Sequence, residues 1–171
     1  ISYEALPIET NDEGKENLFA GRCDVYTTDA SGLSSTRAAA SNPDKWVVLP
    51  EIISKEPLGP LVRHGDHQWG DVVRWSLNAM IIAEELGVTS ENVDAQLGSN
   101  VPEVLRLLGV EGSYGEMLEL APDWAYQIIK QIGNYSESYE ANVGPDTPLE
   151  IARGLNALWT QGGILYAPPF R

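Results

Sequence analysis

Cysteine, histidine and basic residues are scarce in this 171-residue chain, and each shortage narrows the possible functions. The single cysteine, Cys23, cannot close a disulfide within the chain, so cysteine usage leaves the redox compartment open. Eleven Lys plus Arg residues stand against 25 Asp plus Glu, and a net charge of −14 repels the phosphate backbone of a nucleic-acid partner. The two histidines lie in one turn, so the chain offers no convincing Ser/His/Asp or Cys/His triad.

Long apolar runs are also missing from the sequence, and from its first residues we expect no signal peptide. The longest apolar run, residues 79–83, is far shorter than the roughly 18 residues that a membrane span needs. The chain begins with Ile-Ser-Tyr, without Met or a basic n-region, so we expect a mature or truncated product rather than an intact precursor. Its length suits one domain or two small lobes with a sizeable core.

The first third of the chain alternates between strand and helix signals. Weak alternation predicts an edge strand over residues 1–8, and branched or aromatic residues predict strands over 25–27 and 46–49. Capping and turn residues bracket helices expected over 11–20 and 30–40. The order strand, helix, strand, helix, strand predicts a small parallel α/β lobe.

The character of the sequence changes after this lobe. Pro57, Gly59 and Pro60 interrupt the apolar residues of an extended connector, which we interpret as a crossover between two lobes. The predicted division is residues 1–54, a crossover at 55–63, and a mostly helical part at 64–171. Helical spacing predicts helices over residues 68–86, 90–97, 101–108, 122–132, 135–142 and 148–159.

Asp29 is the most interesting single residue. It follows a predicted strand and precedes a predicted helix, a place where ligands collect in open α/β sheets, and Thr28 stands beside it. Its carboxylate can hold an ammonium group through a charge-assisted hydrogen bond. The plainer alternative is an N-cap, which is a common role for Asp.

Two other groups of residues have simpler explanations. His64, Asp66 and His67 offer metal-ligand chemistry, but adjacent ligands on one turn rarely converge, and Asp66 suits the N-cap of the helix that follows. The five tryptophans favour core and inter-helix packing over a binding groove.

Several runs, taken together, carry a resemblance to a known family. GRCDVYTTD (21–29), VVLPEIISKEPLGP (47–60) and RGLNALW (153–159), with YQIIKQIG (126–133) and YAPP (166–169), resemble the general (polar) L-amino-acid-binding proteins of bacterial ABC transporters. These are periplasmic solute-binding proteins of the two-lobed type. The resemblance covers nearly the whole chain but only about the C-terminal half of such a protein.

The resemblance implies a fold, a ligand and partners. The fold would be α/β and periplasmic-binding-protein-like, with a remnant of the second lobe in residues 1–54 and the helical part of the first lobe in 64–171. Asp29 matches the carboxylate that binds the α-ammonium group of a free L-amino acid, and Thr28 lines the same strand end. A membrane permease is the implied partner, the periplasm the implied compartment, and no cofactor or covalent chemistry is implied.

The resemblance also implies what this chain does not supply. The family's carboxylate-binding arginine, its aromatic wall and the partner of Cys23 belong to earlier segments. We therefore expect a homo-oligomer, most simply a dimer that exchanges elements. The alternatives are an interaction module that has lost ligand binding and, more remotely, a metal-dependent hydrolase that uses His64 and His67.

Overall fold

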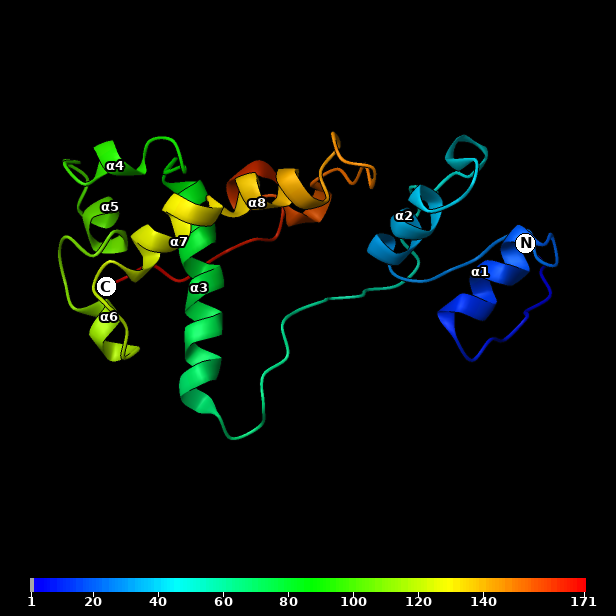
Figure 1. The fold of residues 1–171 in the computed structure, drawn as a ribbon, viewed down its shortest axis with the longest axis horizontal. Coiled ribbons are helices and arrows are strands. Elements are labelled where there is room, and N and C mark those ends of the chain that lie inside the picture. The colour runs from blue at the N-terminus through cyan, green and yellow to red at the C-terminus, as the bar shows by residue number, and fades with distance from the viewer. Residues whose placement is uncertain (1) are drawn as a thin grey trace. The chain divides into compact units, whose positions relative to one another are not determined.

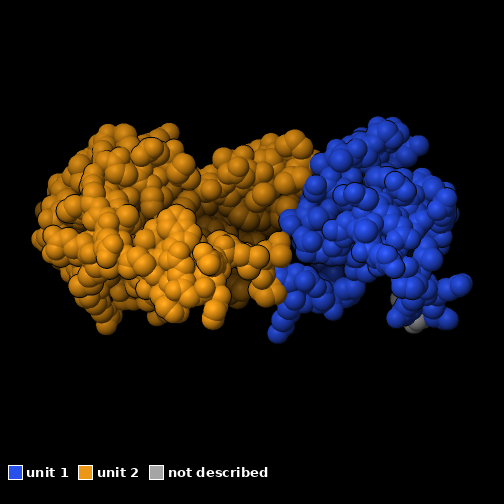
Figure 2. Space-filling model, turned by 60° about the horizontal axis from the view of Figure 1, so that its bottom comes forward, with its two compact units in different colours: residues 1–56 blue, residues 57–171 orange. Residues whose placement is uncertain are grey.

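The computed structural model describes residues 2–171 and is built almost entirely from helices and irregular segments (Figure 1). The α-helices of this described chain are α1 (Asn11–Phe19), α2 (Ala30–Ala38), α3 (His67–Glu85), α4 (Val93–Gln96), α5 (Pro102–Leu107), α6 (Tyr114–Met117), α7 (Trp124–Ile132) and α8 (Tyr135–Asn142). Short 3₁₀ helices lie at η1 (Pro43–Lys45), η2 (Gly154–Asn156) and η3 (Trp159–Gln161). The chain divides into two compact units, residues 1–56 and 57–171 (Figure 2).

Unit 2 is organised around α3. Its 19 residues contact α5, α7 and α8, and its second half buries Ala79, Ile82 and Ala83. A fully buried Leu or Ile side chain contributes about 1.5–3 kcal/mol through the removal of apolar surface from water, so this face of α3 anchors the unit. All buried apolar residues of the described chain lie in unit 2.

The C-terminal tail returns to this core. The Phe170 ring stacks on Trp75 of α3 at 5.2 Å between centroids and meets Trp124 of α7 edge-on at 6.1 Å. The Arg106 guanidinium donates to the Phe170 carbonyl at 3.2 Å. The tail is therefore an integral part of the packing of unit 2.

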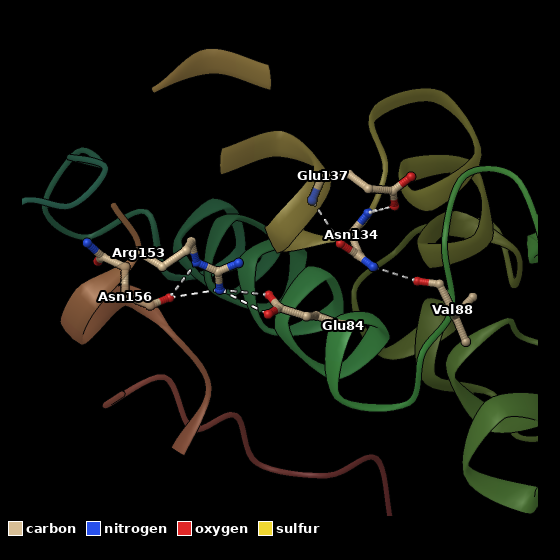
Figure 3. Close-up of polar contacts among 6 residues, drawn as sticks. All are labelled: Glu84, Val88, Asn134, Glu137, Arg153 and Asn156. Carbon is tan, nitrogen blue, oxygen red and sulfur yellow. Dashed lines mark hydrogen bonds and ion pairs between the residues drawn. The ribbon is translucent and has the colours of Figure 1, made fainter. Parts of the chain in front are cut away.

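Two polar clusters, one partly buried and one around the buried Asn134, hold segments of unit 2 together (Figure 3). Nη2 of Arg153 donates to both carboxylate oxygens of Glu84 on α3, at 2.9 and 3.0 Å, and to the carbonyl of Asn156. Asn134 forms a capping box with Glu137 at the start of α8, and its side-chain amide donates to the Val88 carbonyl at 3.0 Å. The bonds from Arg153 to Glu84 and from Asn134 to Val88 thus join parts of unit 2 that are far apart in the sequence, and they satisfy polar groups that are buried or partly buried.

Unit 1 contains α1, α2 and η1 joined by irregular segments, and none of its described residues is a buried apolar side chain. Residues along 46–49 alternate, with Trp46 and Val48 half-buried while Val47 and Leu49 are 78% and 63% exposed. The Trp46 ring meets Phe19 of α1 edge-on at 5.2 Å. The segment 46–49 therefore has one packed side and one outward apolar side.

The predicted parallel sheet is not present in residues 2–171. The segments 25–27 and 46–49 form no strand, nor does the part of the predicted edge strand that the structure describes, residues 2–8. A single parallel bridge, Leu158 to Leu165, is the β pairing of the described chain. The sheet of the expected α/β fold class is therefore not confirmed in residues 2–171, because a strand needs a neighbouring backbone to complete its hydrogen bonds.

The prediction of a helix over residues 148–159 is wrong. Glu150 and Gly154 adopt left-handed backbone conformations, with φ of 53° and 47°, which a right-handed helix cannot include. In its place the chain makes the short η2 and η3, and the Arg153 side chain turns toward Glu84. Elsewhere the long predicted helix over 68–86 is confirmed as α3.

Candidate functional site

The segment before Asp29 is held against α1. The Tyr26 hydroxyl donates to the Asn11 side chain at 3.2 Å, at the start of that helix. A Cβ atom on Gly14 would lie 2.6 Å from the Tyr26 ring, so only glycine permits this close approach of α1 to the segment. Thr28 and Asp29 lie at the end of this segment and are both half-buried. Helix α2 begins immediately after Asp29.

Asp29 is the N-cap of α2. Its backbone is extended (φ −60°, ψ 153°), and its Oδ2 accepts a hydrogen bond from the Gly32 amide at 2.8 Å. The Ser31 hydroxyl donates to the same oxygen at 2.5 Å. The cap alternative for Asp29 is thus confirmed, because its side chain satisfies an amide that has no partner within the helix.

These contacts keep the Asp29 carboxyl ionised. The hydrogen bond from Ser31, followed by that from the Gly32 amide, lowers the pKa of Asp29 below its usual value, although partial burial opposes the change. A group with a lowered pKa carries its full negative charge at neutral pH. Asp29 therefore offers a charged acceptor at the end of the segment.

The two oxygens of Asp29 have different surroundings. Oδ2 accepts both short hydrogen bonds, whereas Oδ1 accepts from the Thr28 hydroxyl at 3.4 Å, which is long for a bond between oxygens. A Cβ atom on residue 32 would lie 3.0 Å from Oδ1 and 3.1 Å from the Thr28 methyl carbon, so Gly32 avoids crowding at this oxygen. Oδ1 is thus the better placed of the two for a further donor.

A separate hollow of about 320 Å³ lies at the opposite end of α2. Its lining includes Phe19, Lys45 and Trp46, and it contains neither Thr28 nor Asp29. The candidate site is therefore a surface carboxylate with its capping contacts, and this hollow is not part of it.

The histidine cluster is explained by helix capping. The Asp66 side chain accepts from the Trp69 amide at 3.1 Å as the N-cap of α3, and both His64 and His67 are exposed. Within residues 2–171, no group of three or more His, Cys, Asp or Glu side chains is arranged to hold a metal ion.

None of the helices in the described residues is long and apolar enough to cross a membrane.

Trp124 is buried in the core, Trp75 packs against this core, and Cys23 is a half-buried free thiol. The packing role expected for all five tryptophans does not extend to Trp69 and Trp159, which are 55% and 52% exposed. The contact of Ser31 with Asp29 was missed by sequence reasoning. A hydroxyl residue two places after a capping Asp was the available signal, since such residues hydrogen-bond locally at helix starts.

Comparison with known proteins gives a consistent result. No protein-family model matches the chain. It is 54% identical over 172 residues to the glutamate/glutamine/aspartate/asparagine-binding protein BztA of Rhodobacter capsulatus, covering all of this chain and 51% of that protein. It is 53% identical to the general L-amino acid-binding periplasmic protein AapJ of Rhizobium johnstonii, again covering all of this chain and 51% of the relative.

A solved structure is similar in fold as well as in sequence. An ABC transporter/periplasmic binding protein from Brucella ovis with glutathione bound matches with a TM-score of 0.89 and 51% identity. The match covers 96% of this chain and 52% of that one. The chain spans about half the length of the relatives it matches, and the resemblance inferred from its motifs is confirmed over its whole length.

Proposed function

We propose that this chain, homologous over its whole length to amino-acid-binding proteins of ABC transporters, contributes the ammonium-binding half of a site for free L-amino acids. The observation that carries the proposal is 53–54% identity to relatives named for amino-acid binding. The ionised carboxylate of Asp29 at the start of α2 supports it. Binding is non-covalent, and no reaction is catalysed.

The chemistry of the proposed contact follows from the two carboxylate oxygens. Oδ1 of Asp29 accepts an N–H of the ligand's α-ammonium group, in a charge-assisted hydrogen bond about twice as strong as a neutral one. The Thr28 hydroxyl, now 3.4 Å from Oδ1, is free to turn and to accept from the same ammonium group. The ligand class is then any amino acid with a free α-ammonium group.

The proposed organisation has two lobes. Residues 1–54 form part of one lobe, 55–63 the crossover, and 64–171 the helical part of the other lobe. In the working protein the lobes close about a hinge around the amino acid and then dock on the membrane permease of an importer in the periplasm. The exposed, proline-containing segment at 55–63, with Leu58 and Leu61 at 73% and 98% exposure, supports the assignment as a crossover.

The exposed apolar side chains of unit 1 support an oligomer as the form in which this chain binds. Val25, Val47 and Leu49 are each more than 60% exposed, and such side chains gain stability when a second surface covers them. A homodimer that exchanges elements between its copies is the proposed form. Size-exclusion chromatography with light scattering at several concentrations tests it, and a compact monomer throughout contradicts it.

Calorimetric titration of the purified chain tests the proposed function. The panel contains free L-glutamate, L-glutamine and L-aspartate, with glutathione, which also carries a free α-ammonium group. N-acetyl-L-glutamate is the matched control, because acetylation removes the ammonium charge and leaves the side chain unchanged. Heat from the free amino acids and none from the acetylated compound is the expected result.

The second candidate is an interaction module without ligand binding. The exposed apolar side chains of unit 1 favour it, since they fit a protein partner as well as an oligomer. A chain that assembles in light scattering but gives no heat with any free amino acid supports this module over the binding protein.

A further inference from the structure

We propose that Ser31 is a positioning residue for the ligand, holding Oδ2 of Asp29 so that Oδ1 accepts the α-ammonium group. This inference rests on the proposed function and adds a residue that the family resemblance does not assign. It follows from how three donors are shared between the two oxygens of one carboxylate.

The first step is the geometry at Oδ2. The Ser31 hydroxyl and the Gly32 amide both donate to this oxygen, at 2.5 and 2.8 Å, from consecutive residues of the first turn of α2. The Gly32 amide is fixed by the helix backbone, and the Ser31 hydroxyl adds a second, side-chain donor to the same oxygen, so together they restrict the orientation of the carboxylate plane. The Gly32 amide alone provides one hydrogen bond and leaves the carboxylate freer to rotate about it.

The second step is the geometry at Oδ1. Its hydrogen bond from the Thr28 hydroxyl is 3.4 Å long, which is outside the usual range for two oxygens and therefore weak. An ammonium donor competes easily with such a contact. The oxygen that the ligand needs is the one that the helix does not use.

The third step concerns charge. A helix N-terminus carries a partial positive charge, which disfavours a cation nearby. The negative charge of Asp29 has to outweigh this effect, so the carboxyl must stay ionised over the working pH range. The hydrogen bond from Ser31 is the largest cause of the lowered pKa of Asp29, so it extends the ionised range of this carboxyl to lower pH.

Ser31 is exposed and its removal leaves the core unchanged, so it is accessible to a clean test. Ser31→Ala removes the hydroxyl, and Ser31→Thr restores it on the same atom position. Ser35→Ala is the matched control, since Ser35 is an exposed serine one turn further along α2. Each variant is examined by ¹³C NMR titration of the Asp29 carboxyl and by calorimetry with L-glutamate at several pH values.

The expected result is that Ser31→Ala raises the pKa of Asp29 and weakens L-glutamate binding about tenfold, because one charge-assisted hydrogen bond is lost. The pH at which affinity falls on acidification moves upward as well. Ser31→Thr recovers most of both effects, and Ser35→Ala matches the parent.

The outcomes separate this inference from the proposed function. If Asp29 titrates identically in the parent and in Ser31→Ala, the positioning role is overturned, whether or not the chain binds amino acids. If Ser31→Ala changes the titration of Asp29 but binds L-glutamate as the parent does, the role in binding is overturned. If the parent binds no amino acid at all, the proposed function fails, and the inference that depends on it falls with it.

Discussion

Replacing Asp29 with Asn separates its two roles. Asn is as good an N-cap as Asp, so its side-chain oxygen is expected to accept from the Gly32 amide as Asp29 now does at 2.8 Å. The negative charge, however, is lost, and with it the charge-assisted bond to an ammonium group. Asp29→Asn therefore tests ligand binding with the start of α2 intact.

The magnitudes follow from the contacts. A hydrogen bond to a charged group contributes about 2 kcal/mol, so the affinity of Asp29→Asn for L-glutamate is expected to fall about thirtyfold. Loss of the cap costs about 1 kcal/mol, and it affects Asp29→Ala but changes Asp29→Asn by only a few tenths of that. Calorimetry measures the affinity, and hydrogen exchange at the amides of α2 measures the local stability.

Asp66 provides the matched control. It caps α3 through a hydrogen bond from the Trp69 amide at 3.1 Å, and it has no proposed role with the ligand. Asp66→Asn is therefore expected to bind L-glutamate as the parent does. Unchanged affinity in Asp29→Asn, with α2 still protected from exchange, refutes the assignment of Asp29 to the ammonium group and leaves it only a cap.

Three further predictions concern stability. Arg153→Met leaves the Glu84 carboxylate without its cation, so the free energy of unfolding measured by chemical denaturation is expected to fall by about 3 kcal/mol. Adding Glu84→Met is expected to recover most of this loss, and a loss below about 1 kcal/mol in the single variant contradicts the pairing. Gly109→Ala places a Cβ atom 1.9 Å from a backbone carbonyl oxygen, whereas Gly87→Ala shares the left-handed backbone conformation but has open space around it. Gly109→Ala is therefore expected to lower the free energy of unfolding by about 2 kcal/mol more than Gly87→Ala, and equal losses contradict the close contact. The hydrogen bonds that lower the pKa of Asp29 in the folded state stabilise α2 at pH values above the usual aspartate pKa of about 3.9. This stabilisation is lost as the pH falls through the lower pKa of the folded state. Hydrogen exchange of α2 against pH should show this loss in the parent and not in Asp29→Asn.

The parts of the fold that the sequence predicts well are those decided by local chemistry. Helix α3 has apolar residues at helical spacing, Asp66 as an N-cap at its start and Gly87 just after its end. The N-cap role of Asp29 is predictable for the same reason, because an N-cap is specified within four residues. A reader of the sequence can place such features without knowing what they pack against.

The predictions that the structure does not bear out concern segments whose conformation depends on contacts with residues distant in the sequence. The segment around Val25 and that around Val47 have the composition of strands, but branched residues make a strand only when another backbone lies beside them. Arg153 lies where a helix was expected, and its side chain reaches Glu84, 69 positions earlier in the chain. No window of neighbouring residues contains that information.

The site shows the same division at the scale of one side chain. One oxygen of Asp29 is used by the turn that follows it, through Ser31 and Gly32, and local sequence is enough to specify those bonds. The other oxygen, Oδ1, has only the long hydrogen bond from the Thr28 hydroxyl. Any further partner of Oδ1 comes from residues distant in the sequence or from another molecule. Under the proposed function, Oδ1 of Asp29 recognises the α-ammonium group, which is the part that free amino acids share. The chain spans about half the length of its relatives, so under the same proposal we expect discrimination among amino-acid side chains from other surfaces that complete the site.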